Sequence, residues 1–142
     1  MKPFEIRNAK NSDVNELINL CKQLGYAIRK IDLLEQLSIM VKSDDHNVFV
    51  CRSGEKVIGW LHVQVSRRIE SGAFAEIGGL VVDKDYAKRG IGKRLIEEAE
   101  NWASSKELST IRVRCNARRS GALKFYKSVG FTEKKTQKIL DK

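Results

Sequence analysis

Residues 77–82 read IGGLVV and residues 84–94 read KDYAKRGIGKR, and the rest of the chain can be interpreted outward from this junction. The first run is continuously apolar, as in a buried strand, whereas the second is polar and contains two glycines. Apolar residues at helical spacing follow: Ile91, Leu95, Ile96, Ala99, Trp102 and Ala103. The junction is therefore predicted to be a turn that leads from a strand into a helix beginning near Gly90.

The first turn of this predicted helix carries an unusual charge. Lys93 and Arg94 lie at its N-terminus, where the helix dipole favours Asp or Glu. Gly90 and Gly92 allow a ligand to approach the backbone, and the free amides of a first helical turn point outward. Together these features predict a binding site for a polyanion such as a pyrophosphate. The alternative interpretation is a basic, glycine-containing connection that binds nothing.

Length and composition indicate a soluble globular protein. The 142 residues are enough for one domain with its own core, so residues 1–142 are predicted to form a single domain. Hydrophobic residues make up 42% of the chain and charged residues 32%, which argues against disorder. The net charge of +9 suggests an acidic partner. Nucleic acid, an anionic membrane and a phosphorylated small molecule all fit that charge.

Cysteine and histidine usage limits which disulfide and metal sites the chain can form. Cys21, Cys51 and Cys115 are odd in number and far apart, which fits neither a disulfide scaffold nor a zinc site and suggests a reducing compartment. With only His46 and His62, a multi-histidine centre is excluded, and no metal is predicted. The N-terminus lacks the apolar run of a signal peptide, and no segment approaches membrane-spanning length. A cytoplasmic protein without a membrane partner is expected.

Hydrophobic periodicity predicts a mixed α/β domain. The predicted elements are a strand at 4–7, helices at 13–24 and 31–41, strands at 48–52, 57–65 and 73–82, a helix from residue 90, a strand at 110–115, a helix at 120–129 and a weak strand or hairpin at 131–140. Residues 67–72 are predicted to be a polar loop. Rossmann, Walker A and nucleophile-elbow motifs are each incomplete or absent.

Three motifs carry a resemblance to a known family. Gly90 and Gly92 match the pattern [QR]-x-x-G-x-[GA] after a hydrophobic strand, with Ala87 in place of Gln or Arg. Residues 122–131, ALKFYKSVGF, match A-x-x-[FL]-Y-x-x-x-G-F, and residues 74–77, FAEI, are similar to the catalytic strand of histone acetyltransferases. With these motifs in order, the chain resembles the GNAT superfamily of N-acetyltransferases, and in particular small bacterial enzymes similar to the aminoglycoside-modifying ones. The resemblance implies a single-domain GNAT fold with a central mixed, twisted sheet of six to seven strands and about four helices.

The resemblance also implies acetyl-CoA as the acetyl donor. Backbone amides of residues 88–93 would hold its pyrophosphate, and Leu80 and Val82 would pair with the pantetheine arm as a neighbouring strand does. The Leu80 amide would polarise the thioester carbonyl. Asn116 lies near a position where the family often has a cofactor-contacting Asn, with a longer spacing to Tyr126 than usual, and Arg119 occupies the commoner position. The implied cofactor-binding residues are Leu80, Val82, Lys88, Arg89, Gly90, Ile91, Gly92, Lys93 and Asn116.

Two residues are catalytic candidates. Tyr126 lies on the apolar face of its predicted helix and is the candidate acid for the departing thiolate; the alternative is a core tyrosine. Glu76 is the candidate base, directly or through a water, and the alternative is an ion pair at the sheet surface. His62 either faces an acceptor pocket or is a structural histidine.

Two functions remain open from the sequence. The first is an acetyl-CoA-dependent N-acetyltransferase that acts on a primary amine, of a small molecule or a protein, by direct attack in a ternary complex. The second is a non-catalytic GNAT-like module that binds nucleic acid or another polyanion through its basic face, as the +9 charge and Ala87 suggest. Nucleic acid is the less favoured partner because no recognised binding motif is present and few aromatic residues interleave with the basic ones. A homodimer is an expectation of the family resemblance alone.

Overall fold

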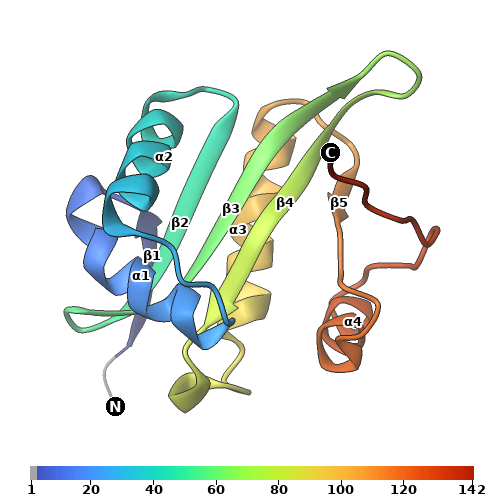
Figure 1. The fold of residues 1–142 in the computed structure, drawn as a ribbon. Coiled ribbons are helices and arrows are strands. Elements are labelled where there is room, and N and C mark those ends of the chain that lie inside the picture. The colour runs from blue at the N-terminus through green and yellow to red at the C-terminus, as the bar shows by residue number, and fades with distance from the viewer. Residues whose placement is uncertain (1–2) are drawn as a thin grey trace.

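The structure, a computed structural model, describes residues 3–142 (Figure 1). These residues form a five-stranded sheet with four α-helices and two short 3₁₀ helices. The elements are β1 (Phe4–Asn8), η1 (Asn11–Asp13), α1 (Val14–Gln23), α2 (Lys30–Lys42), β2 (His46–Ser53), β3 (Lys56–Arg68), β4 (Gly72–Val82), η2 (Lys84–Tyr86), α3 (Ile91–Ser105), β5 (Ile111–Val113) and α4 (Ser120–Ser128). The predicted order of helices and strands is confirmed up to α4.

The strands lie in the sheet in chain order, β1-β2-β3-β4-β5. Strands β1 to β4 are antiparallel neighbours, whereas β5 runs parallel to β4. The polar loop predicted at 67–72 is shorter than expected, because β3 and β4 continue pairing as far as Arg68 and Gly72. Gly72 has a φ of +77°, a conformation that glycine adopts without steric cost, and it permits the tight reversal.

Helices cover both faces of the sheet (Figure 1). On one face, α1 and α2 pack against apolar side chains of β2, β3 and β4, among them Val48, Val50 and Val81. On the other face, α3 buries Ile91, Leu95, Ile96, Ala99 and Ala103 against the sheet. Each sheet face thus has its own core cluster, as alternating side chains on a strand allow.

The prediction of six to seven strands was wrong, because the sheet of the described residues has five. The weak strand or hairpin predicted at 131–140 does not form there. Its central run, TEKKTQK at 132–138, offers no alternating apolar face that either layer could bury, and Ile139 and Leu140 are 83% and 88% exposed. A hydrogen bond from Arg114 Nη1 to Gln137 Oε1, 3.0 Å long, links this tail to the chain beyond β5.

Candidate active site

Strand β4 loses its neighbour on one side part-way along its length. Strand β5 pairs only with Ala75, Glu76 and Ile77, so residues of β4 beyond 77 have an open edge toward β5 and α4. The Asp83 amide donates to the Ile58 carbonyl on β3 at 2.8 Å. Since alternate residues of a strand direct their N–H and C=O groups to opposite sides, those of Leu80 and Val82 face the open edge. This edge can pair with an extended ligand.

A β-bulge at Gly78 sets this orientation. Val63 pairs with Ile77 and His62 pairs with Gly79, which leaves Gly78 as the extra residue. Before the bulge, odd-numbered residues face β5, as the bond from the Ala75 amide to the Thr110 carbonyl shows. After it, even-numbered residues face the same side. The bulge therefore aims the Leu80 amide into the opening between β4 and β5.

Two glycines at the bulge are required by the side chains of β3. A Cβ at Gly78 would lie 2.5 Å from His62 Nδ1, and a Cβ at Gly79 would lie 2.6 Å from Cη2 of Trp60. Both separations are far below van der Waals contact. Trp60 and His62 thus press directly against the backbone of β4 next to its open edge.

The turn before α3 presents free backbone amides. Lys88 and Gly90 have φ values of +60° and +80°, and α3 begins at Ile91 without a side-chain cap on its first turn. The first helical bond runs from the Arg94 amide to the Gly90 carbonyl. The amides of Ile91, Gly92 and Lys93 therefore have no partner within the helix, as at every uncapped N-terminus. This is the arrangement that binds phosphate groups in other proteins.

Gly90 and Gly92 are required for different structural reasons. A Cβ at Gly90 would meet nothing within 4 Å, so its positive φ explains the glycine. A Cβ at Gly92 would lie 2.8 Å from Cζ of Phe125, so this glycine lets α4 pack against the first turn of α3. Around them the side chains of Lys88, Arg89 and Lys93 are exposed. Arg89 stacks over Tyr86 at 5.0 Å from the ring centroid.

Tyr126 on α4 is partly buried and packs against the same core cluster as Leu80 and Val82. Its ring packs edge-on against Phe125 and Phe131. Burial, followed by the nearby Cys115 thiol, raises the pKa of Tyr126 to about 12. The raised pKa keeps the phenol protonated at neutral pH, and within residues 3–142 its hydroxyl makes no hydrogen bond that would compete with a ligand.

Glu76 forms the ion pair that was one of its two sequence interpretations. Its carboxylate accepts a hydrogen bond from Arg114 Nε at 2.8 Å and a longer one, 3.4 Å, from Gln64 Nε2. The Glu76 side chain is only 12% exposed. A carboxylate held in this way can receive a proton after it parts from Arg114, or through a water between it and the donor.

The loop after β5 is ordered by local hydrogen bonds. The Asn116 Oδ1 atom accepts a bond from the Arg118 amide at 2.9 Å, so this oxygen supports its own turn. Arg119 reaches across to the end of α1 and donates to the Leu24 carbonyl at 3.2 Å. This contact ties the start of α4 to the α1–α2 connection.

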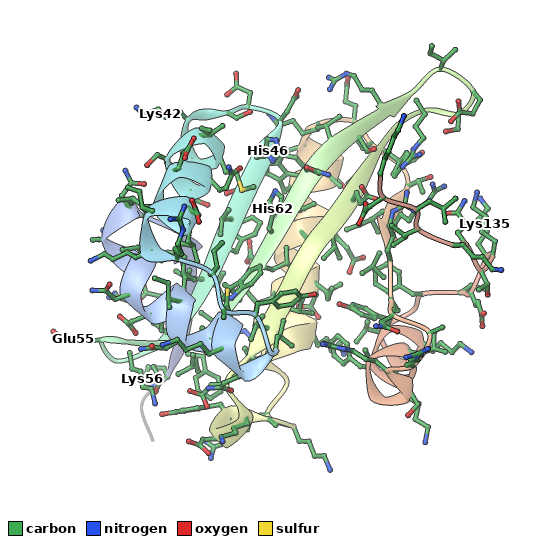
Figure 2. The ribbon with its side chains drawn as sticks, in the orientation of Figure 1. Lys42, His46, Glu55, Lys56, His62 and Lys135 are labelled. Atoms are coloured by element: carbon green, nitrogen blue, oxygen red, sulfur yellow. The ribbon has the colours of Figure 1, made fainter. Side chains whose placement is uncertain are left out.

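A histidine pair that the sequence did not predict lies on β2 and β3 (Figure 2). His46 Nδ1 is 2.9 Å from His62 Nε2, and the rings stack 5.2 Å apart. Burial, with a smaller contribution from His46, lowers the pKa of His62 to about 4. Two histidines on consecutive antiparallel strands indicate such a pair only once the register is known, and here the register makes them diagonal neighbours.

A cavity of about 190 Å³ lies between α1, α2 and the sheet. Its walls are mainly apolar and include Leu17, Leu33, Leu37, Met40, Val48 and Trp60, with His62 beside them. Trp60 and His62 are the same side chains that press on Gly79 and Gly78. The cavity therefore shares a wall with the bulged part of β4.

Comparison with known proteins agrees with this geometry. A model of the acetyltransferase (GNAT) family matches residues 11–131. The chain belongs to the GNAT family. The open edge of β4, the bulge and the uncapped start of α3 are thus features of a GNAT domain. Among the described residues, no group of three or more metal-ligating side chains is present, and no helix is both long and apolar enough to cross a bilayer.

Several proteins that are similar to this GNAT chain are named as N-acetyltransferases. It is 27% identical over 146 residues to the uncharacterized N-acetyltransferase MJ1207 of Methanocaldococcus jannaschii, with 97% of the chain matched. The chain spans 65% of the length of that relative. The aminoglycoside N-acetyltransferase AAC(6')-Iy, solved in complex with CoA, superposes with a TM-score of 0.92 at 18% identity, covering 100% of this chain and 96% of the other.

A second aminoglycoside 6'-N-acetyltransferase, AAC(6')-Ig from Acinetobacter haemolyticus, superposes with a TM-score of 0.87 at 16% identity. The match covers 97% of each chain. At these identities, the two superpositions establish that the fold is shared.

Proposed function

We propose that this protein is an acetyl-CoA-dependent N-acetyltransferase that transfers the acetyl group to a primary amine by direct attack in a ternary complex. The observation that carries the proposal is the open edge of β4 beyond residue 77, with the groups of Leu80 and Val82 aimed into it. The free amides at the start of α3 lie at the end of the same strand, after a short connection. Family membership and the relatives' names support the same reaction.

Different site residues bind different parts of acetyl-CoA in this proposal. Backbone amides of residues 88–93 bind the pyrophosphate, with the exposed side chains of Lys88, Arg89 and Lys93 nearby. Leu80 and Val82 pair with the pantetheine arm along the open edge. Asn116 contributes from the opposite side of the opening through its side-chain amide, because its oxygen supports the turn.

The chemistry has three steps. The amine nitrogen attacks the thioester carbonyl carbon, and the Leu80 amide stabilises the oxyanion that develops. The carbon–sulfur bond then breaks, and Tyr126 donates its proton to the departing thiolate. Glu76 receives the proton that the amine loses, through a water or after release from Arg114. A phenol with a raised pKa suits this role, because it stays protonated until the thiolate forms.

Several broader features follow from the same proposal. We propose that residues 1–142 act as one domain and that the protein works in the cytoplasm. The free thiols Cys21, Cys51 and Cys115 support a reducing compartment.

A coupled thiol assay tests the reaction. The purified protein is incubated with acetyl-CoA and a panel of primary amines, and release of free CoA thiol is followed. We expect amine-dependent thiol release, and the Tyr126→Phe variant serves as the matched control with reduced turnover. Thermal stabilisation by an oligonucleotide but not by acetyl-CoA, without thiol release, would instead support a non-catalytic polyanion-binding module.

A further inference from the structure

We infer that the acceptor is a primary monoamine whose apolar body, about the size of one phenyl ring, binds in the cavity between α1, α2 and the sheet. This inference rests on the proposed function for the reaction itself. Binding of such an amine can nevertheless be measured without turnover. It names a substrate class that differs from the aminoglycosides in the names of the solved structures.

The size of the cavity supports a single ring. Its volume is about 190 Å³. An apolar cavity of roughly 150 Å³ lined by aliphatic and aromatic side chains is large enough for benzene. The walls here are largely of the same kind, with Leu33, Leu37 and Met40 from α2 and Trp60 and Val48 from the sheet, and the polar residues Gln36 and His62 complete the lining. A phenyl group or a branched aliphatic group of similar volume therefore fits.

The position of the cavity places the amine near the reacting bond. Its wall toward β4 consists of Trp60 and His62, which press on Gly79 and Gly78. Leu80, whose amide faces the open edge, is the next residue after Gly79. An amine whose apolar body lies against Trp60 can extend its nitrogen past this bulge toward the thioester.

The charges of this region disfavour a polycation. None of the residues that line the cavity carries a carboxylate. Of the carboxylates near the cavity, Glu76 pairs with Arg114, Asp32 with Arg29, and Asp45 with Arg67. Glu35 and Asp44 are exposed and lie outside the lining. A second ammonium group in the apolar cavity would lose its hydration without a partner. The net charge of +9 also repels an acceptor with several positive charges.

Binding can be measured through Trp60. The protein has two tryptophans, so the Trp102→Phe variant leaves Trp60, which lines the cavity, as the only one. The variant is titrated with 2-phenylethylamine, with the triamine spermidine and with the aminoglycoside neamine. We expect a saturable change in Trp60 fluorescence with 2-phenylethylamine alone. A saturable response to spermidine or neamine, or none to 2-phenylethylamine, overturns the inference.

Matched variants on α2 localise the binding. Met40 lines the cavity, whereas its neighbour Ile39 is 56% exposed and outside the lining. Met40→Glu should weaken binding of 2-phenylethylamine about tenfold or more, and Ile39→Glu should leave it unchanged, since both add the same charge. Equal effects of the two substitutions contradict the assignment.

If Met40→Glu does not fold, Met40→Ala provides a second test, because it enlarges the cavity. It should shift the preference toward 4-phenylbutylamine relative to 2-phenylethylamine. An unchanged preference contradicts the assignment.

The two proposals fail in different ways. If calorimetry detects no acetyl-CoA binding while Trp60 still responds to 2-phenylethylamine, the proposed reaction fails and the apolar amine site stands. If acetyl-CoA binds and thiol release occurs faster with spermidine or neamine than with 2-phenylethylamine, the reaction stands and the apolar acceptor is excluded.

Discussion

His46 Nδ1 and His62 Nε2 lie 2.9 Å apart, so the two rings share one hydrogen bond. One of these two nitrogens donates and the other accepts, so only one of the two can carry a proton. The ring planes differ by 11°, and His62 also fills the space that Gly78 leaves on β4. Through these contacts the pair connects β2 and β3 to the bulge beside the proposed reaction site. Protonation of His62 would therefore change the packing of its ring against Gly78 at the bulge.

The first prediction concerns stability in mild acid. The pKa of His62 is lowered from 6.5 to about 4 by burial and by His46. The unfolded chain therefore binds a proton at His62 more tightly than the folded chain does. The stability of the folded state relative to the unfolded state is thus fully retained above pH 6.5 as far as His62 is concerned, and it is lost as the pH falls toward 4. Between pH 7.5 and pH 5 we expect a loss of about 2 kcal/mol in unfolding free energy. Urea unfolding at the two pH values measures it.

The control for this prediction is His62→Phe. The variant should lose clearly less stability over the same pH interval, whatever its stability at pH 7.5. Parallel pH dependences for the variant and the wild type would mean that His62 is not the group responsible.

The second prediction concerns Tyr126. Its hydroxyl should be the acid for the departing thiolate, because burial keeps it protonated. Tyr126→Phe should lower kcat by about 10²- to 10³-fold. Acetyl-CoA affinity, measured by calorimetry, should change little because the ring and its contacts with Phe125 and Phe131 remain. Unchanged turnover removes Tyr126 from the mechanism.

The third prediction separates the two roles of Glu76. If the carboxylate accepts the proton of the amine, Glu76→Gln should flatten the pH dependence of kcat/KM and lower its plateau about 10²-fold. Arg114→Gln removes the other half of the 2.8 Å ion pair and should retain the pH dependence. A purely structural pair would give two variants with similar losses of stability and identical pH profiles.

The fourth prediction tests packing between α3 and α4. Gly92→Ala places a methyl group 2.8 Å from Cζ of Phe125, so the ring or α4 must move. Overpacking of this kind typically costs about 1–3 kcal/mol, against which the better helix propensity of Ala returns up to about 1 kcal/mol. In a Phe125→Leu background the substitution should cost at least about 1 kcal/mol less. Additive effects in the double-mutant cycle would contradict the contact.

The fold was largely predictable because its signals are local. Apolar periodicity identified α1 to α4, and the polar, glycine-containing run 84–94 identified the turn before α3. Gly90 was correctly placed at the start of that helix, where its positive φ has a local cause. The strand at 131–140 was wrong because a strand needs a partner and a face to bury, and its residues provide neither.

The remaining site features depend on contacts between distant residues. Gly92 was interpreted as a point of ligand approach, but its closest constraint is Phe125, 33 positions later in the chain. Glu76 and Arg114 meet only because β4 and β5 are parallel neighbours. The His46–His62 pair requires the register of β2 on β3. Periodicity predicts elements, but it does not specify register, and these three relationships depend on register or on tertiary packing.

Calorimetric titration with acetyl-CoA of the wild type and of Leu80→Pro tests the central claim most directly. The Leu80 N–H faces the open edge and not β3, so proline removes a ligand contact without removing a hydrogen bond of the sheet. We predict one-to-one binding by the wild type and at least about tenfold weaker binding by the variant, with similar melting temperatures. The absence of heat with the wild type, or equal affinity of both proteins, would contradict the account.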